Sequence, residues 1–82
     1  MSDKSEMEKA MEAIRSFLEK NYIGKFVVAL SDYNETIVIK TDANILLRIR
    51  YDADFGTWFV LEAFTNIEMI VDIAKILEVH IP

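Results

Sequence analysis

The residues best suited to recognition chemistry are three cations and one tryptophan that strand alternation places on a single face of a predicted sheet. They are Lys40, Arg48, Arg50 and Trp58. Arg and Trp are enriched among the residues that dominate binding energy at protein interfaces, so this set favours a partner-binding surface. Basic and aromatic side chains on a sheet also bind nucleotides, which makes nucleic-acid or phosphate-ligand binding the alternative. A third interpretation is that arginine stems and β-branched side chains only stabilise the sheet.

Other motifs with chemical potential are better explained as turns. The triplet Asp54-Phe55-Gly56 matches the metal-binding triplet of protein kinases, but none of the companion kinase motifs is present. The run from Asp52 to Asp54 resembles the start of an EF-hand loop, yet Gly56 stands where the third ligand belongs. His80 is the only histidine and there is no cysteine. We therefore predict no catalytic residue, no metal site and no cofactor.

Length and composition predict a single small domain over residues 1–82. The hydrophobic share of 52% is high for so short a chain, which suggests that part of the apolar surface meets a partner. The net charge of −5 disfavours non-specific attraction to nucleic acid or anionic membranes. No signal peptide is recognisable, and the most apolar segment, 67–81, is too short and too interrupted by charges to span a bilayer. We expect a soluble cytoplasmic protein without membrane contact.

The element that organises the chain is a predicted hairpin over Asn44–Phe64, with a loop at residues 52–56. Alternation pairs Tyr51 with Thr57, Ile49 with Phe59, and Leu47 with Leu61, so that two apolar rows coincide. This register predicts that Phe59 lies in the core, where its replacement by alanine would cost about 3–5 kcal/mol. It also predicts that Trp58 lies on the opposite face.

Two helices and two more strands complete the predicted order. A capping box at Ser5–Glu8 begins a helix that ends near Gly24, and a second capping box begins a very apolar helix at Thr65. Between helix and hairpin, strands are predicted over Lys25–Ser31 and Thr36–Lys40, joined by a turn at residues 32–35. The alternation in residues 77–82 is also compatible with an extended tail.

The resulting fold class is α+β: a helix, a four-stranded antiparallel meander and a helix (αββββα), with both helices on one sheet face. The predicted helix-facing row is Phe26, Val28, Leu30, Ile37, Ile39, Ile45, Leu47, Ile49, Tyr51, Phe59 and Leu61. The opposite face is predicted to be unusually apolar for a solvated sheet face. From that face we take the predicted partner-binding residues, Lys40, Leu46, Arg48, Arg50, Trp58, Val60 and Phe64.

These patterns favour a non-enzymatic protein-interaction module, such as an adaptor, an inhibitor or a regulatory subunit. A viral or mobile-element origin is compatible with the small size and acidic charge. The apolar sheet face and the apolar second helix suggest a homodimer through one of these two surfaces. The alternative function is binding of nucleic acid or a phosphate ligand through the basic and aromatic sheet face.

Overall fold

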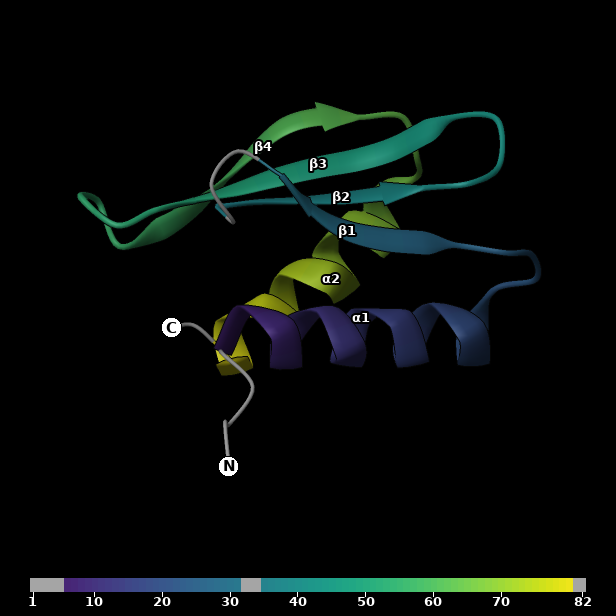
Figure 1. The fold of residues 1–82 in the computed structure, drawn as a ribbon, viewed down its shortest axis with the longest axis horizontal. Coiled ribbons are helices and arrows are strands. Elements are labelled where there is room, and N and C mark those ends of the chain that lie inside the picture. Colours follow the sequence, from purple (N-terminus) through teal and green to yellow (C-terminus); the bar gives the residue numbers. More distant parts are fainter. Residues whose placement is uncertain (1–5, 32–34, 81–82) are drawn as a thin grey trace.

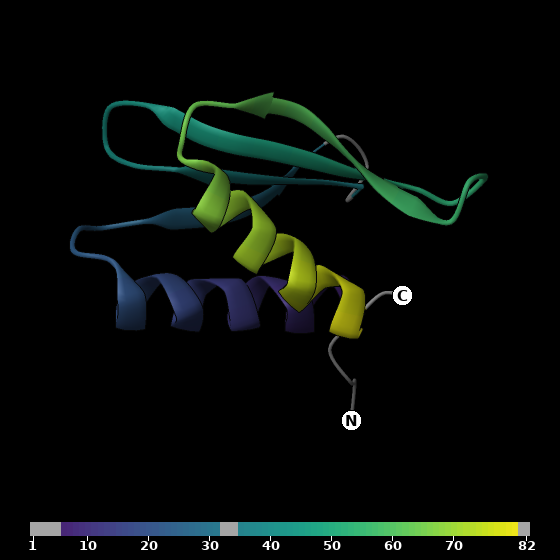
Figure 2. The same ribbon diagram turned by 180° about the vertical axis from the view of Figure 1, so that it is seen from behind.

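The computed structural model describes residues 6–31 and 35–80, and it confirms the predicted αββββα order. The elements are α1 (Glu6–Asn21), β1 (Val27–Ser31), β2 (Thr36–Lys40), β3 (Ile45–Asp52), β4 (Thr57–Ala63) and α2 (Ile67–His80). The four strands form one antiparallel sheet in the order β1-β2-β3-β4. Both helices lie on the same face of the sheet, α1 toward β1 and α2 toward β4 (Figures 1 and 2).

The core lies between this helix pair and the helix-facing side of the sheet, here called the inner face. Each helix contributes a row of buried side chains at four-residue spacing, which is one stripe of an α-helix. The buried helix residues are Ala10, Ile14 and Leu18 in α1 and Met69, Ile73 and Leu77 in α2. The buried apolar residues of the sheet are Val28, Ile37, Ile39, Leu47 and Ile49, all at most 4% exposed.

The pairing of β3 with each of its two neighbours, β2 and β4, is interrupted once. At each interruption one residue has no partner on the adjacent strand. Between β2 and β3, Ile39 pairs with Leu47 and Lys40 pairs with Ile45, so Leu46 is the extra residue. Between β3 and β4, Arg48 pairs with Glu62 and Ile49 pairs with Val60, so Leu61 is the extra residue. Each interruption is a bulge, which changes the face that the following side chains occupy.

The predicted register of the central hairpin is wrong, because its turn closes one residue later on β3. The pairs are Asp52 with Thr57, Tyr51 with Trp58, and Leu47 with Ala63, not Tyr51 with Thr57 and Leu47 with Leu61.

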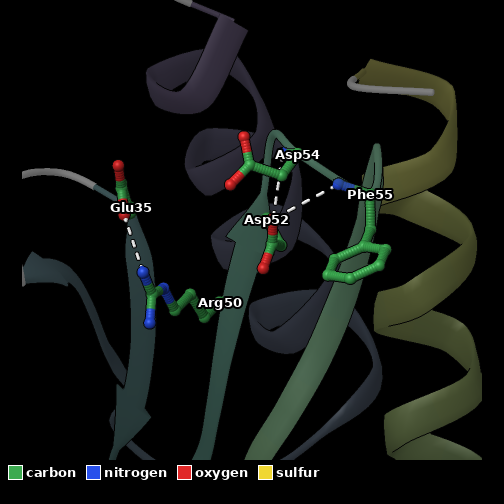
Figure 3. Close-up of polar contacts among 5 residues, drawn as sticks. All are labelled: Glu35, Arg50, Asp52, Asp54 and Phe55. Carbon is green, nitrogen blue, oxygen red and sulfur yellow. Dashed lines mark hydrogen bonds and ion pairs between the residues drawn. The ribbon is translucent and has the colours of Figure 1, made fainter.

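The side chain of Asp52 explains this closure. Its Oδ1 accepts the backbone N–H groups of Asp54, at 2.9 Å, and Phe55, at 3.3 Å (Figure 3). Gly56 follows with φ of +63°, a conformation that glycine adopts without steric cost. The predicted turn chemistry is therefore confirmed, but Asp52 ends the strand instead of starting the loop.

Three residues predicted for the inner face are exposed as a result. Phe59 and Leu61 are both 44% exposed, and Ile45 is 40% exposed. Phe59 lies opposite Arg50, and Ile45 lies opposite Lys40, so both fall on the face away from the helices, here called the outer face. For Ile45 the bulge at Leu46 accounts for the change of side, whereas for Phe59 the later closure of the hairpin at Asp52 does.

The helix ends follow local capping chemistry. Gly24, with φ of +130°, lies just beyond the end of α1 as predicted, whereas Ser5 falls outside the described residues. At α2 the cap is Asn66 instead of Thr65, since Oδ1 of Asn66 accepts the N–H of Met69 at 2.9 Å. α2 continues to His80, so residues 77–80 are helical. The predicted turn at residues 32–34 also lies outside the described part.

The cap assignment predicts a difference between two adjacent substitutions. Asn66→Ala should lower the free energy of unfolding by about 0.5–2 kcal/mol, because it leaves the N–H of Met69 without its acceptor. Thr65→Ala should cost less, because the Thr65 hydroxyl donates only to the sulfur of Met69, at 3.4 Å. Urea unfolding curves of both variants measure the difference, and a larger loss for Thr65→Ala would contradict the assignment.

Candidate functional site

The predicted partner-binding residues do not share one face of the sheet. Lys40, Arg48 and Arg50 lie on the outer face, as predicted. Trp58 and Val60 lie opposite Tyr51 and Ile49, so they belong to the inner face, which corrects the prediction. The remaining two lie at the bulged end of the sheet: Leu46 is the half-buried extra residue of β3, and Phe64 follows β4 with 68% of its surface exposed.

The two arginines of the outer face are paired with carboxylates. Nη1 of Arg48 lies 2.9 Å from Oε1 of Glu62, its direct cross-strand partner. Nη2 of Arg50 lies 3.3 Å from Oε2 of Glu35, in an exposed pair (Figure 3). Pairs of this kind contribute little to stability, about 0–1 kcal/mol when exposed. Their effect here is to reduce the positive potential that a phosphate group would meet.

The change of face at Trp58 and Phe59 separates the tryptophan from the arginines. Trp58 packs against the buried core and meets Tyr51 edge to face, with ring centroids 5.1 Å apart. Phe59 takes the outer position opposite Arg50, and its ring contacts that of Phe55 with centroids 6.2 Å apart. The aromatic ring beside the arginines is therefore Phe59, not Trp58.

A larger feature is an exposed apolar surface along β4 and the first half of α2, which we call the β4–α2 surface. More than half of the large apolar side chains exposed in the described residues lie within residues 59–71. The surface consists of Phe59, Val60, Leu61, Phe64, Ile67 and Val71, with exposed fractions from 44% to 74%. β4 and α2 lie on the same side of the molecule, turned toward the viewer in Figure 2.

Exposure on both faces of β4 identifies it as an incompletely covered edge strand. Phe59 lies on the outer face and Val60 on the inner face, yet they are 44% and 51% exposed. Trp58 packs against the buried core, whereas Val60 is about half open. Soluble proteins usually protect such an edge with charge, proline or a covering element. The described part of β4 has a single charged residue, Glu62, and its bulge at Leu61.

Sequence reasoning missed four members of this surface: Phe59, Leu61, Ile67 and Val71. Phe59 and Leu61 were assigned to the core by alternation. Ile67 and Val71 are four residues apart on a helix that is apolar around most of its circumference, and that excess is the signal that one stripe remains uncovered. The sequence alone does not show which stripe of α2 is uncovered, because this depends on the position of α2 relative to β4.

A shallow pocket of about 620 Å³ adjoins this surface at the bulged end of the sheet. Its lining residues are Ala43, Asn44, Ile45, Leu46, Glu62 and Phe64. This mixed lining of apolar side chains, one amide and one carboxylate suits an apolar or basic side chain of a partner, although Glu62 is already paired with Arg48. Phe64 belongs to both the pocket and the β4–α2 surface, so the two features adjoin at this residue.

The groups considered for metal or acid–base chemistry lie apart. Within residues 6–31 and 35–80, no three His, Cys, Asp or Glu side chains are placed to hold a metal ion. The carboxylate of Asp52 serves the turn, and His80 is half-buried in the last turn of α2. Neither helix of the described chain is long and apolar enough to cross a membrane.

Comparison with known proteins identified no relative. No protein-family model, curated protein or solved structure matches the chain. The functional proposal therefore depends on the exposure and chemistry of the described surfaces.

Trp58 packs on the core and Phe59 faces outward. We therefore predict that Trp58→Ala destabilises the protein more than Phe59→Ala, the reverse of the order expected from alternation alone. Trp58→Ala should lower the free energy of unfolding by about 2–4 kcal/mol, because it removes a large side chain packed on the core. Phe59→Ala should cost about 1 kcal/mol or less, since this side chain is nearly half exposed. Urea unfolding followed by circular dichroism compares the two, and a greater loss for Phe59→Ala would contradict the observed faces.

Proposed function

We propose that the protein is a non-enzymatic protein-interaction module, acting as an adaptor, inhibitor or regulatory subunit through its β4–α2 surface. The observation that carries the proposal is the run of exposed apolar side chains from Phe59 to Val71 on one edge strand and the adjoining helix. Contiguous exposed apolar patches are uncommon on monomeric proteins and mark sites of association.

The composition of the surface supports a protein partner. Two phenylalanines and four aliphatic residues supply contact area, and the only charged side chain on β4, Glu62, is paired with Arg48. The centres of protein interfaces are enriched in aromatic residues and depleted of unpaired charge. The adjoining pocket beside Phe64 offers a recess for a side chain of the partner.

The alternative, nucleic-acid or phosphate-ligand binding, has less geometric support. It requires Trp58 beside the cations, whereas Trp58 lies on the inner face and both arginines have carboxylate partners. We therefore expect the fluorescence of this single tryptophan to stay unchanged when a single-stranded oligonucleotide is added at low salt. Quenching that disappears steeply as salt is raised would instead favour the alternative.

A site-specific photo-crosslinker tests the proposed surface directly. Placed at position 67, where Ile67 is 74% exposed, a benzophenone amino acid should form discrete protein adducts in the source cell. The matched control carries the same group at Glu19, an exposed position of α1. Adducts from position 67 and not from position 19 are the expected result. No discrete adduct, or the same adducts from both positions, would overturn the proposed surface.

A further inference from the structure

The sheet has two edge strands, β1 and β4, and they differ in how well they are protected against pairing with another strand. β1 is five residues long, is preceded by the exposed Lys25, and carries one large side chain exposed above 40%, Val27. β4 is seven residues long, contains no lysine or proline, and exposes three consecutive apolar residues from Phe59 to Leu61. β4 is thus the edge at which another strand can add.

Charge does not oppose the pairing of two β4 strands. The chain carries a net charge of −5, so two copies repel each other on average. β4 contributes little to this repulsion, because its only charged residue, Glu62, is paired with Arg48 at 2.9 Å. Two β4 strands can therefore approach without bringing unpaired like charges together.

We propose that the partner at this edge is a second copy of the chain, and that the two β4 strands pair antiparallel across a two-fold axis. This inference rests on the proposed function and names its partner. The resulting sheet is continuous through eight strands, with the two α2 helices on the same side of it. Ile67 and Val71, on α2 next to β4, become part of the same contact.

Symmetry distinguishes this arrangement from pairing of β4 with β1. An antiparallel β4–β4 contact uses the same surface on both copies and closes after two. A β4–β1 contact uses different surfaces and leaves one free edge at each end, so it continues beyond two copies, into a closed ring or an open filament. The exposed Lys25 beside β1 opposes that second arrangement.

The contact is small for a specific interface, as is typical of weak, reversible association. Seven residues of β4 at about 3.4 Å each give a strip about 24 Å long. With the sheet and helix layers together about 20 Å high, each copy contributes about 500 Å², close to the lower limit for specific interfaces. We therefore expect a reversible dimer with a dissociation constant of about 1–100 µM.

Sedimentation equilibrium of the intact chain from about 1 µM to about 1 mM tests this proposal. Phe59→Lys and Phe59→Glu each bring two like charges together across the two-fold axis, so each variant alone should dimerise at least about tenfold more weakly. An equimolar mixture of the two should recover dimers, because the opposed charges then attract.

The matched control is Val27→Lys on β1, where the native side chain is also 44% exposed, and it should dimerise as the unmodified chain does. Circular dichroism checks that each variant is folded.

A monomeric unmodified chain across the whole range would overturn the pairing. So would normal dimerisation of the folded Phe59→Lys variant, or failure of the mixture to recover dimers. If the chain is monomeric while the crosslinker at position 67 still captures other proteins, the second copy is excluded and the proposed function stands. If both measurements are negative, both proposals fall.

Discussion

The backbone pairing of β3 with β4 decides which side chains of this protein are available to other molecules. Asp52 accepts two backbone N–H groups of the loop and closes the hairpin opposite Thr57, and the extra residue Leu61 then brings Glu62 opposite Arg48. Between these two points, Trp58 packs on the core and Phe59 faces outward. The ion pair of Arg48 and the exposure of β4 both follow from this register.

Most of the fold was predictable because it depends on patterns that are local in the sequence. Helix stripes at three- and four-residue spacing located both helices, and alternation located β2 at the residues where it is observed. The buried residues Leu47 and Ile49 were also placed correctly. The turn residues Asp52 and Gly56 are recognisable in the sequence. That the hairpin closes with the pair of Asp52 and Thr57 is not.

The candidate site was less predictable because bulges leave no compositional signal here. Leu46 and Leu61 look like ordinary members of apolar strands, and only the cross-strand ladder shows that neither has a partner on one neighbouring strand. Closure of the hairpin with the pair of Asp52 and Thr57 places Phe59 on the outer face, and Val60 is half exposed although it lies on the inner face. The excess of apolar residues indicated an interaction surface, whereas its location required the tertiary structure.

Edge geometry and charge together lead from fold to function. β4 is an apolar, locally neutral edge strand, so it favours contact with another molecule. The rest of the chain is acidic, which opposes non-specific contact. The most direct test of this account is amide hydrogen exchange as a function of protein concentration. The account predicts that amides of β4 gain protection as concentration rises, while those of β1 do not. Equal exchange of the β4 amides at all concentrations would contradict it.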